Sequence, residues 1–167
     1  EMELKMLTIT TIITVSILSV AAMDVWQRLV HRLGGLPPTN WMMVGRWLLT
    51  SVNTHKIFGH QLQKITPYPN ETMIGWVFHY LIGIVYVIAY TILWKNVGIL
   101  TLTFLDGLIF GVVSVVVPWF FFMPAMGAGV MGCKTQRPVV GCLSALGVHS
   151  VFGVAIALLL QLSQQYN

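Results

Sequence analysis

Three ionisable side chains lie in or beside long apolar stretches of this sequence: Asp24, His79 and His149. An ionisable group is costly in lipid, so it usually faces the interior of a helix bundle and finds a partner there. Histidine changes its charge near neutral pH, and a carboxylate with imidazoles can bind protons or a metal ion. Two histidines at one depth could instead ligate a haem. These three residues are therefore the candidate intramembrane polar site.

The two histidines have similar surroundings in the sequence. "HYLIG" begins at His79 and "HSVFG" at His149, and both share the pattern His-x-x-x-Gly. At about 1.5 Å per residue, both rings lie roughly 10–14 Å from the start of their predicted helices. This spacing predicts one layer that also contains Asp24, and it favours a tandem repeat of a helical hairpin. The alternative for Asp24 is an ion pair with Arg28, four residues later on the same helix face.

Small residues follow the same four-residue spacing as the histidines. Residues four apart share one helix face, and small side chains let membrane helices approach closely. We therefore expect the second and fourth long helices to pack against each other through these faces. The predicted packing residues are Gly75, Gly83, Gly141, Ala145, Gly153 and Ala157.

The composition indicates how these side chains are positioned. The chain has 167 residues, of which 56% are hydrophobic and 8% charged, whereas soluble domains carry about 25% charged residues. So few charges cannot cover a water-exposed surface. The sequence predicts an all-α integral membrane protein, a four-transmembrane-helix bundle that occupies residues 1–167 as a single domain. The predicted spans lie near 6–28, 72–94, 98–122 and 140–163.

Basic residues predict the orientation of this bundle. The first and third loops carry most of them: Arg28, Arg32, Arg46, Lys56, Lys64, Lys134 and Arg137. The opposite side has only Lys5 and Lys95. The positive-inside rule then places both termini outside the cell and these loops in the cytoplasm. A short helix near 39–52 is expected at the cytoplasmic interface, and Cys133 and Cys142 are expected as free thiols.

The third span is expected to be irregular. Pro118 lies inside it, and a proline removes a backbone donor and kinks a helix. Pro124 and the glycine-rich segment after it are expected to end the helix in a cytoplasmic turn. Asp106 is expected near the outer end of this span as a helix-end or partner contact, too far from the histidines to join them.

Five motifs, in this order and spacing, resemble those of a bacterial family of small predicted inner-membrane proteins that is classed as a domain of unknown function. The motifs are "AAMDVW", "VGRW", "GWVFHYLIG", "PWFFFMPAMGAG" and "HSVFG". The resemblance covers nearly the whole chain and implies a multi-span protein of the bacterial inner membrane, with no assigned activity. Motif or motif-adjacent residues of unknown role are Arg46, Asp106, Pro124, Gly127 and Gly129.

The sequence leaves three functions open. The first is a non-enzymatic bundle that acts by contact with membrane partners, as an accessory subunit, an assembly factor or an immunity factor. The second is a small carrier for protons, a metal ion or a small solute that uses the Asp24, His79 and His149 layer. The third is a bis-histidine haem or redox protein.

The remaining expectations concern catalysis and partners. No hydrolase or nucleotide-binding motif is present, so no catalytic residue is assigned, and the sequence specifies neither a cofactor nor a metal. A copper site at Met123, Met126 and Met131 also stays open. The expected partners are the lipid bilayer and either another membrane protein or further copies of this chain, with no nucleic acid.

Overall fold

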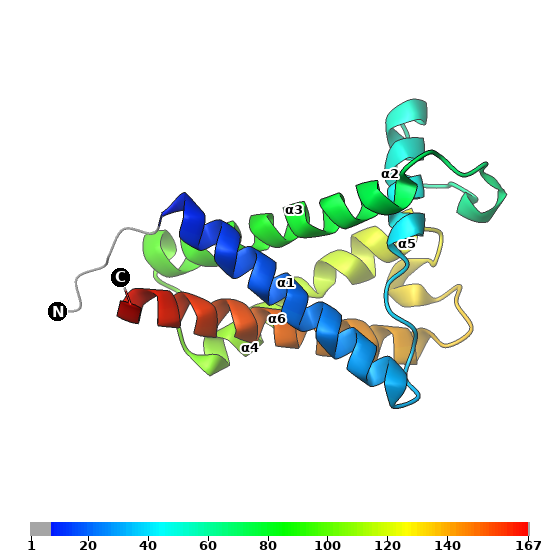
Figure 1. Ribbon diagram of the computed structural model, residues 1–167. Helices are drawn as coiled ribbons and strands as arrows, with labels where there is room; N and C mark the ends of the chain where they lie inside the picture. The colour runs from blue at the N-terminus through cyan, green and yellow to red at the C-terminus, as the bar shows by residue number, and fades with distance from the viewer. Residues whose placement is uncertain (1–7, 167) are drawn as a thin grey trace.

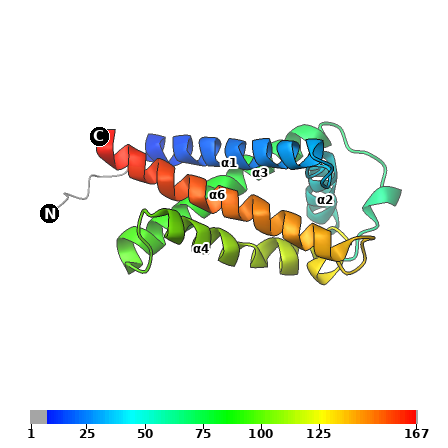
Figure 2. The ribbon, with the colours of Figure 1, turned by 90° about the horizontal axis from the view of Figure 1, so that it is seen from below.

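The computed structural model describes residues 8–166, which form helices and loops without a β-strand. Four stretches are long and apolar enough to cross a membrane. They run side by side, and the start of α1 and the end of α6 lie at the same end of the bundle (Figures 1 and 2). The prediction of an all-α chain with four such helices is confirmed.

The bounds of the long helices agree with the predicted spans to within a few residues. The first, second and fourth stretches are α1 (Ile9–Arg32), α3 (Glu71–Ile92) and α6 (Pro138–Tyr166). The third consists of α4 (Phe104–Ser114), the π-helix η3 (Pro118–Phe122) and α5 (Met123–Ala125). Shorter elements are η1 (Leu62–Lys64), η2 (Leu93–Val97) and η4 (Val130–Gly132). The predicted start at residue 6 lies outside the described residues.

A short helix, α2 (Trp41–Thr54), lies across the bundle at the end opposite the start of α1 (Figures 1 and 2). It begins after Asn40, whose side-chain oxygen accepts a hydrogen bond from the backbone N–H of Met43 at 3.3 Å. Asparagine is favoured at this position because its side chain satisfies a free N–H of the first turn. The short helix expected near residues 39–52 is therefore present.

Helix α2 packs on α3 at two glycines. A Cβ at Gly45 would overlap the carbonyl oxygen of Glu71, and a Cβ at Gly75 would overlap that of Trp41. Both overlaps are with backbone atoms, which cannot move aside as a flexible side chain can. Only glycine lets the two helices lie at this distance.

A buried ion pair fixes the same contact. The Arg46 guanidinium donates to both carboxylate oxygens of Glu71, from Nε at 2.9 Å and from the second terminal nitrogen at 2.6 Å. Its remaining nitrogen donates to the carbonyl oxygen of Leu62 at 3.3 Å. The hydrogen-bonded Glu71 carboxylate raises the pKa of Arg46. Such a two-pronged contact needs the planar fork of arginine.

The third stretch is irregular at the predicted place. Regular α-helix ends at Ser114, and the backbone becomes a π-helix from Pro118 onward. Gly127, Gly129 and Gly132 then adopt positive φ angles of 86°, 76° and 69°, which turn the chain toward α6. At the other end, Asp106 lies in the first turn of α4 and accepts a hydrogen bond from the backbone N–H of Thr101 at 2.7 Å.

The expected pairing of the second and fourth long helices through their glycines is wrong. Gly83 of α3 packs against the side chain of Val20 in α1. Gly153 of α6 packs against α4, where an added Cβ would lie 2.6 Å from the backbone nitrogen of Gly111. Gly141 contacts no helix, because nothing lies within 4 Å of a Cβ at that position. Each close glycine contact therefore joins helices that follow each other in one half of the chain.

We predict opposite effects for alanine at two glycines of α6. Gly153→Ala should destabilise the protein by about 1–3 kcal/mol, because its Cβ meets backbone atoms of α4. Gly141→Ala should leave stability unchanged or raise it by up to about 1 kcal/mol, because its Cβ meets open space and glycine is a poor helix former. Unfolding in detergent measures both, and equal effects would contradict the packing.

We also predict that Arg46→Lys lowers the thermal midpoint by several degrees, because lysine cannot donate to both oxygens of Glu71. Arg28→Lys is the matched control, since Arg28 is exposed on α1. Differential scanning fluorimetry in detergent compares the two variants. A midpoint equally unchanged in both would show that the ion pair does not hold α2 in place.

Candidate functional site

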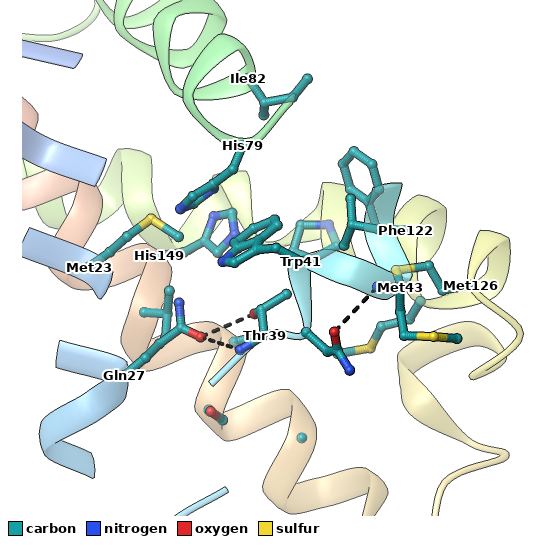
Figure 3. A pocket seen from close by; sticks show the side chains of 18 of the residues that line it. Met23, Gln27, Thr39, Trp41, Met43, His79, Ile82, Phe122, Met126 and His149 are labelled. Atoms are coloured by element: carbon teal, nitrogen blue, oxygen red, sulfur yellow. Dashed lines mark hydrogen bonds between the residues drawn. The ribbon is translucent and has the colours of Figure 1, made fainter. Parts of the chain in front are cut away.

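A cavity of about 540 Å³ lies between the long helices at the end of the bundle where α2 crosses. Its walls come from the second half of α1, the first half of α3, the end of the third stretch, the start of α6 and α2. His79 and His149 both line it, with Trp41 of α2 between the helices (Figure 3). The cavity is thus the place where the candidate polar residues meet.

His79 lies on this wall with Asp24 behind it. Its Nε2 is 3.1 Å from Oδ1 of Asp24, and both side chains are buried. The imidazole stacks on the indole of Trp41 with ring centroids 3.8 Å apart and planes at 22°. The carboxylate on one side and the indole on the other fix the orientation of the ring.

Asp24 therefore pairs with His79 of α3, and the alternative ion pair with Arg28 is wrong. Within the described part of the chain, Arg46 forms an ion pair with Glu71, and Asp24 bonds to His79. Asp24 is buried, whereas Arg28 is exposed on the same helix. The helical spacing of four residues permitted their contact, but the two side chains have different surroundings.

His149 is held by the other half of the chain. Its Nδ1 is 2.8 Å from Oγ of Ser114, and Ser114 lies 2.8 Å from the carbonyl oxygen of Gly111, to which its hydroxyl donates. The edge of the ring faces Tyr86 with centroids 5.9 Å apart. No contact joins His149 to Asp24 or His79 directly, so the predicted layer consists of a bonded pair and a separate histidine on one cavity.

The hydrogen bonds of Ser114 indicate which nitrogen of His149 carries the proton. A serine hydroxyl has one proton, and when it donates to the Gly111 carbonyl oxygen its Oγ is left as the acceptor for His149. In this arrangement Nδ1 of a neutral His149 donates to Ser114 Oγ. The proton-free Nε2 is left as an acceptor, and it makes no hydrogen bond within residues 8–166.

The rest of the wall is largely apolar. Aliphatic, aromatic and methionine side chains dominate, and the described lining residues include no Lys, Arg, Asp or Glu. Polar groups are few: the two histidines, Gln27, Thr39, Asn40, Gln63 and Ser144, with the hydroxyl-bearing ring of Tyr86 and the indole of Trp41. Such a wall suits a molecule that is mostly apolar and makes a small number of hydrogen bonds.

Small residues of α6 create part of this space. Ala145 and Gly141 line the cavity about one and two turns before His149. Both belong to the stripe expected to bring helices together, but here their small size leaves room. Only the part of the stripe beyond His149, where Gly153 and Ala157 lie against α4, serves close helix packing.

The other half of the bundle is filled. Aromatic rings of Tyr90, Phe110 and Phe152, with Ile156 and Leu160, belong to the main buried core. Tyr86 packs edge-on against Phe152 with centroids 5.7 Å apart. This core closes the cavity on the side of the bundle where α1 begins and α6 ends.

Several contributors could not be identified from the sequence. Ser114, Trp41 and Gln27 reach the site only because the fold brings distant segments together. Glu71 was visible only as a charge at the start of a span, and its pairing with Arg46 has no local signal. Pro124, Gly127 and Gly129 belong to the turn below the cavity.

Metal binding has little support in this geometry. Within the described residues, no group of three or more His, Cys, Asp or Glu side chains could hold a metal ion. The methionines considered for copper are separated, because Met123 and Met126 line the cavity but Met131 lies outside its wall with 39% of its surface exposed. Cys133 and Cys142 are free thiols, as expected.

Comparison with known proteins gives one match. A family model described as "Protein of unknown function (DUF2938)" matches residues 13–161, which include every residue of the site described above. No protein of curated function and no solved structure matches the chain.

We predict that nitrogen NMR of histidine-labelled protein at neutral pH shows His149 as the tautomer with its proton on Nδ1. The chain of hydrogen bonds through Ser114 is the reason. Ser114→Ala should release this preference and leave the His79 signals unchanged. A wild-type His149 with its proton on Nε2 would contradict the assignment.

Proposed function

The chain belongs to the DUF2938 family of proteins of unknown function, and we propose that it is a multi-pass membrane protein that binds a small solute in the cavity between its helices. This is the small-solute form of the carrier predicted from the sequence. The observation that carries the proposal is the cavity of about 540 Å³ with both histidines on its wall. Pockets of about 300–1,000 Å³ with a few polar groups typically hold small molecules.

The distribution of charge supports a place in the bacterial inner membrane with both termini outside. The loops that carry the basic residues lie at the end of the bundle where α2 crosses, opposite the start of α1 (Figure 1). The positive-inside rule assigns that end to the cytoplasm. Lys5, which the rule also counts, lies outside the described residues.

The shape of the cavity supports access from one side. It extends from the end of the bundle near α2 to Tyr86 and Phe152, and the aromatic core fills the bundle beyond them. A solute on this proposed topology would meet the histidines from the cytoplasmic half. Asp24 and His79 form a buried pair beside it, as intramembrane ionisable groups at a functional site often do.

The contacts of the two histidines support a tandem hairpin. In the first half, His79 bonds to Asp24 of α1, and Gly83, four residues later, packs on the same helix. In the second half, His149 bonds to Ser114 of α4, and Gly153 packs on that helix. In each hairpin, the histidine of the His-x-x-x-Gly pattern thus bonds to the other long helix of that hairpin, and the glycine packs against the same helix.

The other two functions stay predictions. A single chain does not test the contact function, in which the partner would be another membrane protein or a further copy, nor does it test the haem function. The cavity favours the solute function over the contact function, because packing alone does not require an empty space of this size.

We predict that Cys133 reacts with a membrane-impermeant maleimide in inverted membrane vesicles and not in intact spheroplasts. Cys133 is exposed in the loop before α6, on the side proposed to be cytoplasmic. The Cys133→Ser variant controls for reaction at Cys142. Labelling in intact spheroplasts would overturn the orientation.

We predict that the protein, extracted with its lipids into nanodiscs, contains a small molecule that mass spectrometry detects at near-stoichiometric amounts. Gly141→Phe should reduce that amount at least about tenfold, because the ring fills space that the solute needs. Val139→Phe is the matched control, since Val139 is 69% exposed in the same turn of α6. An empty wild-type cavity, or equal occupancy in both variants, would contradict the proposal.

A further inference from the structure

A second hollow adjoins the cavity on the flank of the bundle. It has a volume of about 270 Å³ and lies between α1 and α6. Four residues line both spaces: Gln27, Leu36, Ser144 and Val148. The hollow and the cavity therefore share a wall, and only these side chains separate them.

The flank hollow faces the side of the bundle that the proposed topology gives to lipid. Trp26, Val140 and Leu143 line it and are exposed at 39%, 43% and 61%. Residue Gly147 lies at its floor, where an added Cβ would be 3.5 Å from the indole nitrogen of Trp26. The hollow is thus mostly apolar and opens on the flank of the bundle beside the loop after α1, and none of its described lining residues is charged.

One pair of hydrogen bonds holds the segment between the two spaces. Oε1 of Gln27 accepts from the backbone N–H of Thr39 at 2.9 Å and from its hydroxyl at 3.1 Å (Figure 3). This contact ties α1 to the loop that carries Leu36. A molecule that passes from the hollow to the cavity must displace Gln27 and Leu36.

The polar groups of the cavity specify what the molecule must offer. With its proton on Nδ1, His149 presents an acceptor at Nε2. A ligand that binds this nitrogen has to supply a donor, and a neutral hydroxyl does so without bringing a charge onto a wall whose described residues include no Lys, Arg, Asp or Glu.

We propose that the occupant is an uncharged, lipid-soluble molecule with a hydroxyl group, which enters from the membrane between α1 and α6 and donates a hydrogen bond to Nε2 of His149. This inference rests on the proposed function and specifies its substrate class and its route of entry. It is argued from the flank hollow, the Gln27–Thr39 contact and the arrangement of His149 and Ser114. The proposed function itself was argued from the size of the cavity and does not depend on these three observations.

Three probes of similar shape test the substrate class: β-naphthol, its methyl ether and the corresponding naphthalenesulfonate. Isothermal titration calorimetry in nanodiscs, corrected with empty nanodiscs, should give the lowest dissociation constant for the naphthol. The ether should bind about tenfold or more weaker, because it leaves the buried acceptor without a partner. The sulfonate should bind more weakly still, because its charge finds no partner on the wall.

His149→Phe is the variant that isolates the hydrogen bond. It keeps a ring of similar size, and Ser114 keeps its bond to Gly111. The naphthol should lose about tenfold or more of its affinity in this variant while the ether loses little. Thermal unfolding of His149→Phe checks that it is folded, and His149→Gln, which retains an acceptor, gives a second measurement if it is not.

Rates test the route of entry. Gly147→Phe fills the flank hollow and leaves the cavity wall intact, because Gly147 lines only the hollow. Association and dissociation of naphthol, followed by stopped-flow energy transfer from tryptophan, should slow together by about tenfold with an unchanged dissociation constant. Gly147→Ala should behave as wild type, since its Cβ makes an ordinary contact.

The outcomes separate the two levels of the proposal. No binding of any probe, together with an empty purified protein, would overturn the proposed function itself. Equal affinity for the naphthol and its ether would overturn only the hydroxyl requirement. Unchanged rates in Gly147→Phe would overturn entry between α1 and α6, and tighter binding of the sulfonate would overturn an uncharged occupant.

Discussion

Close contact between helix backbones at glycine is the constraint on which this structure depends. Gly45 and Gly75 bring α2 against α3, and Gly111 and Gly153 bring α4 against α6. Two tight pairs of helices result, and α1 packs along both α3 and α6. Because the tight contacts lie within each half of the chain, the space between the halves is not closed at the end where α2 crosses. The cavity therefore results from the positions at which the helices make close contact.

The polar contacts of the two histidines, like the close glycine contacts, lie within one half of the chain. The two cavity histidines each find a partner on a helix of their own half, His79 with Asp24 and His149 with Ser114. In a helix bundle that spans a membrane, such groups need internal partners, because the lipid offers no water. The α2–α3 glycine contact also brings Trp41 onto the ring of His79. The helix packing and the hydrogen bonds of the polar side chains therefore support the same arrangement of the two histidines.

The sequence was sufficient for the parts of the fold that depend on local pattern. Apolar length predicted the long helices, the short helix near residues 39–52 was expected at its place, and Pro118 marked the irregular part of the third stretch. It failed where two distant segments had to be matched. The small-residue stripe of α6 predicted close packing throughout, yet Gly141 faces a cavity and Gly153 a helix, because periodicity gives the face of a residue and not what lies opposite it. The alternative pairing of Asp24 with Arg28 was wrong for the same reason, whereas Asp24 and His79 of the predicted polar site do pair.

Gly141 separates two properties that are usually linked in a helical protein. A side chain added at most buried positions changes both the packing of helices and the space available to a ligand. At Gly141 nothing lies within 4 Å of an added Cβ, and the residue lines the cavity. A mutation at this one position can therefore change the volume of the cavity while the packing of the helices stays intact. The size of the cavity is thus open to adaptation in single steps.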